Sequence, residues 1–123
     1  MPRTTADAGS AGEAFVAGRL QRAGYRIVDR NWRARGGELD IVALDGDILV
    51  FVEVKVRAGA VVTAAEETVD ARKLRRLLLA AELYVEAHPD LAEHIWRIDL
   101  VAITLGADGV VRRYTHFENL TLE

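Results

Sequence analysis

Apolar residues recur along the chain with two different spacings, and each spacing predicts one kind of secondary structure. Residues 10–23 and residues 70–87 repeat apolar positions in the manner of a helix with one buried face. Ser10 and Glu13 have the spacing of a capping box, which is typical of a helix start. Pro89 cannot continue the second segment as a helix. The pattern therefore predicts two helices.

The segments between and after these helices are rich in β-branched and aromatic residues, which favour strands. Two such runs flank Asp45-Gly46-Asp47, a tight-turn sequence, and this arrangement predicts an antiparallel hairpin. Adjacent glycines at the end of residues 33–37 predict another turn, and residues 57–68 are expected to form a loop. The expected strands cover residues 25–32, the two arms of the hairpin 38–56, and residues 95–105 and 110–117.

The order of these elements indicates the fold class. A helix, three strands, a second helix and two strands predict an α/β fold, with a mixed sheet of about five strands flanked by helices. The length of 123 residues suits a single domain. Residues 1–9 are small and polar, so we expect a disordered tail there and one domain over residues 10–123.

The hairpin is expected to gather charged side chains at one end. Side chains alternate between the two faces of a strand, so Glu53 and Lys55 share a face. A turn of two or four residues centred on Gly46-Asp47 places Asp40 opposite Glu53. The same register places Glu38 opposite Lys55. One end of the hairpin therefore presents three carboxylates and one ammonium group on the same face.

This charge surplus indicates a cation site. Residues 48–56 are otherwise apolar on both faces, as in a buried central strand, where charges are costly unless paired or bound to metal. The oxygen ligands Asp40, Glu53 and Glu38 suit Mg²⁺ or Mn²⁺. Such a metal would polarise a phosphoryl oxygen, and Lys55 would orient a water or stabilise developing charge. The alternative is an ordinary ion-paired strand end open to solvent.

The same residues resemble a known nuclease motif. Glu38-Leu-Asp40, followed after twelve residues by Glu53-Val-Lys55, is similar to the PD-(D/E)xK motif, with Leu39 where the motif's name has proline. The wider string GGELDIVALDGDILVFVEVKVR, with Gly12-Glu13-Ala14 before it, resembles the YraN-like family. That family consists of small bacterial proteins regarded as relatives of archaeal Holliday junction resolvases. The resemblance covers about residues 12–84, over half of the chain.

The resemblance implies a restriction-endonuclease-like core and hydrolysis of phosphodiester bonds. By motif position, Asp40 and Glu53 would be metal ligands and Lys55 the catalytic lysine. Glu13 would be the helix carboxylate that completes such a site. The alternative for Glu13 is a structural role as the returning arm of a capping box with Ser10.

Basic residues flank the acidic end of the hairpin in the sequence, and contacts to nucleic-acid phosphates would explain them. Those in the first turns of the second helix would otherwise oppose the helix dipole. The alternative for that group is a solvated helix face. The candidates for nucleic-acid binding are Arg33 and Arg35 in the expected turn, Arg57 after the hairpin, and Lys73 and Arg76 in the second helix.

The net charge of −3 does not exclude nucleic acid, because the charge is unevenly distributed. Residues 1–76 carry 13 Lys or Arg against 11 Asp or Glu, whereas residues 77–123 carry 3 against 8. A basic patch can therefore coexist with an acidic total. Without cysteine there is no disulfide framework and no thiolate zinc site. No signal peptide or membrane span is evident, so we expect a cytoplasmic protein that does not associate with membranes.

The sequence thus predicts a Mg²⁺-dependent (or Mn²⁺-dependent) endonuclease acting on DNA, with branched or damaged DNA as the expected substrate. A junction substrate would favour a homodimer, because two symmetric strands are cut; this expectation follows from the resemblance. One alternative is a catalytically weak or inactive DNA-binding or scaffolding module with a nuclease fold. Another is a nuclease directed at RNA.

Overall fold

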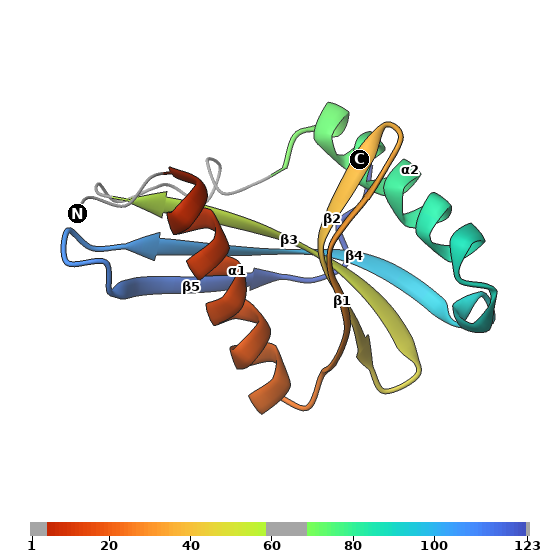
Figure 1. Cartoon of the computed structure of the whole chain (residues 1–123), viewed down its shortest axis with the longest axis horizontal. Coiled ribbons are helices and arrows are strands. Elements are labelled where there is room, and N and C mark those ends of the chain that lie inside the picture. The colour runs from red at the N-terminus through yellow and green to blue at the C-terminus, as the bar shows by residue number, and fades with distance from the viewer. Residues whose placement is uncertain (1–4, 59–68, 123) are drawn as a thin grey trace.

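The computed structural model describes residues 5–58 and 69–122 (Figure 1). Its strands form one mixed sheet in the order β1-β2-β3-β4-β5, in which β3 and β4 run parallel and the other neighbouring pairs run antiparallel. This confirms the predicted α/β class with a five-stranded mixed sheet. In chain order the elements are α1 (Thr5–Arg22), β1 (Arg26–Ala34), β2 (Gly37–Asp45), β3 (Ile48–Ala58), α2 (Ala71–Ala87), the 3-10 helix η2 (Pro89–Leu91), β4 (Ile95–Leu105) and β5 (Val111–Phe117).

The β2–β3 hairpin has the predicted turn and register. Gly46 and Asp47 alone connect the two strands, and Gly46 has a φ of 60°. A left-handed residue at this position is what a two-residue hairpin turn requires. Val42 consequently lies opposite Phe51, as the sequence predicts.

The predicted start of the first helix at Ser10 is wrong, because α1 begins at Thr5. The segment before Ser10 contains two alanines, which favour a helix even without an apolar stripe. Ser10 therefore lies inside the helix and cannot be its N-cap, which removes the capping-box explanation of Glu13. Of the segment predicted to be disordered, residues 1–4 lie outside the described residues and residues 5–9 belong to α1.

Two predicted connections also differ from the structure. The turn predicted over residues 33–37 is shorter, because Arg33 and Ala34 belong to β1 and pair with Glu38 and Gly37 of β2. The predicted loop 57–68 begins later, because β3 continues to Ala58. Residues 59–68 lie outside the described residues.

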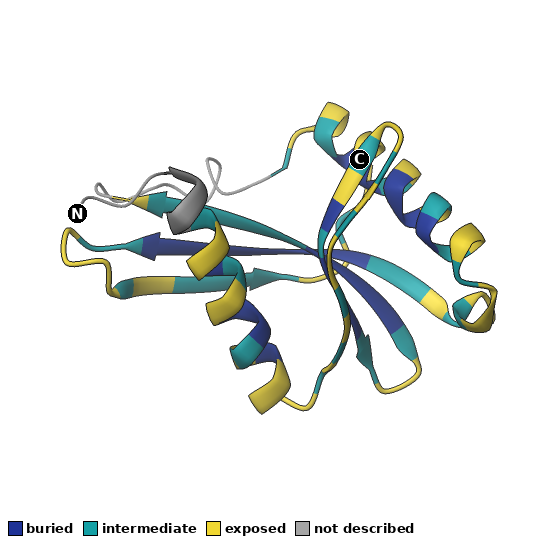
Figure 2. Ribbon diagram, in the orientation of Figure 1, coloured by how far each residue is buried: buried dark blue, intermediate teal, exposed yellow. Residues whose placement is uncertain are grey.

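The two helices cover opposite faces of the sheet (Figure 1). On one face, Leu77 and Tyr84 of α2 pack with Phe51 of β3. On the other face, Val16 and Leu20 of α1 pack with side chains of β2, β3 and β4. Figure 2 shows the buried positions concentrated on the central strands and on the inner sides of both helices. In the part of the chain that the structure describes, neither helix is long and apolar enough to cross a membrane.

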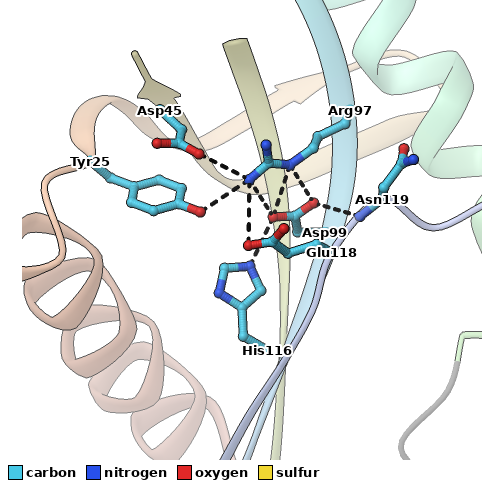
Figure 3. A network of polar contacts seen from close by, with 7 residues as sticks. All are labelled: Tyr25, Asp45, Arg97, Asp99, His116, Glu118 and Asn119. Atoms are coloured by element: carbon cyan, nitrogen blue, oxygen red, sulfur yellow. Dashed lines mark hydrogen bonds and ion pairs between the residues drawn. The ribbon is translucent and has the colours of Figure 1, made fainter.

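A buried polar network joins distant segments on the α1 face of the sheet (Figure 3). Asp99 of β4 is fully buried and accepts hydrogen bonds from Arg97 Nε (3.0 Å) and the backbone N–H of Asn119 (2.9 Å). Its second oxygen lies 2.8 Å from Nε2 of His116. Burial opposes ionisation of Asp99, but the hydrogen bonds from His116, Asn119 and Arg97 outweigh it and lower its pKa.

Arg97 extends this network to the beginning of β1 and the end of β2. Its guanidinium donates to the hydroxyl of Tyr25 at 3.0 Å and to the carboxylate of Asp45 at 3.3 Å. Because these partners come from four parts of the sheet, the network fixes how the strands are arranged around the hairpin.

Replacing Asp99 with Asn should therefore destabilise the fold by about 3 kcal/mol, because it removes the fully buried charge that forms the shortest ion pair of Arg97, at 3.0 Å. Urea unfolding would measure the loss. The difference from wild type should be full above pH 3.8, the ordinary pKa of Asp, and should shrink as the pH falls through the lowered folded pKa. Asp47→Asn, a matched change at an exposed position, should alter stability by less than about 0.5 kcal/mol. Equal effects of the two substitutions would contradict this account of the network.

Candidate functional site

The candidate site lies where β2 separates from β3. The two strands pair from Asp45 opposite Ile48 to Ile41 opposite Val52. Beyond that point, the carboxylate of Asp40 accepts the backbone N–H of Val54 at 2.8 Å. The side chain of Asp40 thus takes over the role of a backbone acceptor. This bond fixes the aspartate at the point where the strands divide.

The structure corrects the predicted position of Glu38. The hairpin ladder does not place Glu38 opposite Lys55, because the pairing of β2 with β3 ends at Ile41, whereas its pairing with β1 continues to Gly37. Glu38 is aligned with Arg33 of β1, and the two side chains form an ion pair at 3.3 Å. The prediction extended a regular ladder through a point where the two strands diverge.

Asp40 and Glu53 form the centre of the site. Their side chains share a hydrogen bond. Burial and the charge of Asp40 raise the pKa of Glu53 to about 7, although Lys73 acts in the opposite direction. The pKa of Asp40 is also raised, mainly by burial and further by Glu38, against the hydrogen bond from Val54. Both raised pKa values mean that the positive charge near the pair does not offset the burial and repulsion that disfavour ionisation of the two carboxyl groups.

Two lysines lie beside this pair on the α2 face. Nζ of Lys73 lies 3.3 Å from a carboxylate oxygen of Glu53, whose side chain is only 15% exposed. The start of α2 positions Lys73, because its N-cap, Asp70, accepts the backbone N–H of Lys73 at 2.8 Å. Lys55 lines a pocket of about 210 Å³ together with Glu53 and Lys73. The predicted catalytic lysine and carboxylate thus face one cavity.

Glu13 approaches the pair from α1, on the opposite face of the sheet. Its pKa is raised first by burial and then by the charge of Asp40, and its side chain is hydrogen-bonded to Asn31. Asn31 has a φ of 53°, an unusual conformation for a residue other than glycine within a strand. Glu38 contributes to the raised pKa values of both Glu13 and Asp40, so it lies within electrostatic reach of the pair without belonging to it.

The donor set fits a hard divalent cation. Among residues 5–58 and 69–122, no three His, Cys, Asp or Glu side chains converge closely enough to enclose a metal ion. Mg²⁺ does not need such an enclosure, because it usually retains several waters and is held by one or two carboxylates together with substrate phosphates. Asp40 and Glu53 supply two carboxylates, and the positive charge around them is too small to stabilise both in the ionised form. They would hold the ion, while Glu38 as a third ligand stays a prediction.

The predicted nucleic-acid-binding residues occupy different surroundings. Arg33 and Arg76 line a pocket of about 390 Å³ between the β1–β2 turn and α2, and Lys73 lies between this pocket and the one at Lys55. Arg35 is exposed in the β1–β2 turn. Arg57 is half-buried in β3, two residues beyond Lys55. Four of these five residues thus lie on β1, β3 or α2 around the carboxylate pair, and their nucleic-acid contacts stay a prediction.

Comparison with known proteins places these features in a family context. Residues 12–103 match the model of the Uncharacterised protein family UPF0102. A UPF0102 protein of Stutzerimonas stutzeri (strain A1501) is 47% identical over 96 residues, which cover 78% of this chain and 80% of the relative. A UPF0102 protein of Ectopseudomonas mendocina (strain ymp) is 46% identical, covering 86% and 87%. One of Chloroflexus aurantiacus (strain ATCC 29366 / DSM 635 / J-10-fl) is 42% identical, covering 90% of each chain.

The raised pKa of Glu53 predicts a pH-dependent effect of its replacement. Because the folded pKa of about 7 exceeds the ordinary value of 4.5, ionised Glu53 reduces stability as the pH rises from 4.5 through 7. In the presence of a chelator, Glu53→Gln should therefore be more stable than wild type above pH 7, by up to about 3 kcal/mol. Below pH 4.5 the two should unfold alike in urea.

The matched control is Glu82→Gln, a change at an exposed position of α2 that should show no such pH dependence. A Glu53→Gln protein that is less stable than wild type at every pH would contradict the account. It would mean that the ion pair with Lys73 outweighs the repulsion from Asp40.

Proposed function

The chain belongs to the UPF0102 family, the YraN-like family, which is restriction-endonuclease-like, and on that premise we propose that it is a metal-dependent DNA endonuclease. The reaction would be hydrolysis of a phosphodiester bond, with Mg²⁺ or Mn²⁺ as the cofactor. Branched or damaged DNA is the proposed substrate.

The observation that carries the proposal is the half-buried pair Asp40–Glu53, with Lys55 in the pocket that Glu53 also lines. The raised pKa values of the pair mean that ionised carboxylates cost stability there, and no structural partner in the described residues removes that cost fully. A cation brought with the substrate would remove it. Destabilised, charged clusters of this kind are typical of active sites.

Each residue then has a definite task. Asp40 and Glu53 would hold the divalent cation, which when bound would supply positive charge to polarise a phosphoryl oxygen and to make water more acidic. The ammonium group of Lys55 orients the attacking water and stabilises the negative charge that develops on the phosphate. Glu13 adds negative charge from the α1 side. Asp40 keeps its orientation through the backbone N–H of Val54.

Metal binding is the first testable consequence. Mn²⁺ should raise the melting temperature of the wild-type protein by mass action, since only the folded chain presents the pair. Without metal, Asp40→Asn should be at least as stable as wild type, because it relieves the repulsion that raises the pKa of Glu53. It should also lose the response to metal. If neither protein responds and Asp40→Asn simply destabilises, the carboxylates are structural, and a DNA-binding or scaffolding module becomes the better description.

Catalysis is the second consequence. Lys55→Met should reduce the cleavage rate of a branched DNA substrate by at least about 100-fold while the metal-induced rise in melting temperature remains. Arg112→Met, purified in the same way, is the control, because Arg112 lies on β5 and pairs with Asp108. Cleavage that persists in Lys55→Met would assign the activity to another site or to a contaminant.

A further inference from the structure

A second pocket, of about 390 Å³, lies on the α2 face and shares Lys73 with the pocket beside Glu53 and Lys55. Two elements form its walls, the β1–β2 turn and the first half of α2. Lys73 and Glu38 connect it to the candidate active site, since Lys73 pairs with Glu53 and the charge of Glu38 acts on Asp40. The lining side chains used below are Arg33, Ala34 and Glu38 from the turn region, and Lys73, Arg76 and Leu77 from α2.

Glycine allows the turn to lie directly on the helix. A Cβ atom at Gly37 would lie 2.9 Å from Cβ of Ala80 and 3.4 Å from the carbonyl oxygen of Arg76. Gly36 adopts a φ of 89°, which side chains other than glycine rarely accept. The pocket is therefore built from a strand turn held against a helix, which gives it a fixed shape.

The charges in this pocket favour an anion. Arg33 pairs with Glu38, and Lys73 pairs with Glu53. For Arg76, no hydrogen bond or ion pair is recorded within the described residues, and its side chain is exposed at the pocket. One positive charge at the pocket thus lacks a partner, beside the apolar surfaces of Ala34 and Leu77.

The size and chemistry of the pocket fit one nucleotide better than an isolated phosphate. Its volume lies in the range of pockets that bind small organic molecules, about 300–1,000 Å³. Guanidinium planes stack on nucleobases, and arginine also binds phosphate. The carboxylate of Glu38 can accept a hydrogen bond from an exocyclic amino group of a base.

We propose that this pocket takes one unpaired nucleotide of the DNA strand, next to the phosphodiester bond held at Asp40 and Glu53. The inference rests on the proposed function. A paired, stacked nucleotide cannot enter a pocket without leaving the duplex, and extruding it costs free energy. The pocket therefore selects DNA that already has an unpaired nucleotide beside the position of the cut. Arg76 binds the phosphate of that nucleotide.

Binding measurements without metal test this proposal independently of cleavage. Fluorescence anisotropy in EDTA would compare a perfectly paired duplex with the same duplex carrying one unpaired nucleotide. The wild-type protein should bind the second DNA about tenfold more tightly, because its unpaired nucleotide enters the pocket without the cost of leaving a duplex. In Arg76→Ala this preference should fall below about twofold.

Two further variants separate charge from shape. Arg72→Ala removes the same charge from an exposed position of α2 that does not line the pocket, so it should weaken binding to both DNAs alike and keep the preference. Ala34→Leu adds volume to the lining without changing charge. It should reduce the preference and leave the affinity for the paired duplex within about twofold.

Equal affinity of the wild-type protein for the two DNAs would overturn the proposal. So would an equal loss for both DNAs in Arg76→Ala, since the pocket would then hold a backbone phosphate of paired DNA. If the preference is present but no DNA is ever cut, the proposed function fails and the nucleotide pocket stands. If DNA is cut without any preference, only the pocket proposal fails.

Discussion

The repulsion between two half-buried carboxylates, those of Asp40 and Glu53, is the constraint on which the candidate site depends. Asp40 and Glu53 lie together because the pairing of β2 with β3 ends at Ile41 and Val52, the residues next to them in the sequence. At that point the backbone ladder is replaced by the hydrogen bond from Val54 to Asp40. The fold thus holds two half-buried acidic groups close together, and a bound cation would stabilise their ionised forms.

Lys73 limits how far the pKa values of Asp40 and Glu53 are raised. Its ammonium group lies on Glu53 and lowers the pKa of both carboxylates, yet both pKa values remain raised. Its position depends on the cap that Asp70 provides to α2. Because the same lysine lines both pockets on the α2 face, it connects the chemistry at Lys55 with the surface around Arg76. The α1 face differs, because the hydrogen bonds that Asp99 accepts there outweigh the cost of burying its charge and lower its pKa. Asp99 therefore stabilises the sheet.

Much of this arrangement could be predicted from the sequence, and the exceptions have physical reasons. The two-residue turn at Gly46 fixes the register of a ladder with a period of two, so Asp40 and Glu53 could be placed together from local signals. The divergence of β2 from β3 could not, because no local signal marks where the pairing of two strands ends, and Glu38 is consequently aligned with Arg33 of β1 instead of Lys55. The start of α1 at Thr5 was missed because that segment has no apolar stripe. The ion pair between Lys73 and Glu53 depends on how α2 packs on the sheet, which the sequence does not show. The only local signal is Asp70, the N-cap of α2, which marks where the helix starts.

Counting the protons released when Mn²⁺ binds would test the central claim most directly. Calorimetric titrations in buffers with different ionisation enthalpies give that number, because a metal displaces protons from its ligands. With a pKa of about 7 for Glu53, the account predicts that Mn²⁺ binds with release of most of one proton somewhat below pH 7. The release should fall towards zero well above pH 7 and be lost in Glu53→Gln. Binding without proton release below pH 7, or the absence of binding, would contradict the claim that this carboxylate pair is a metal site.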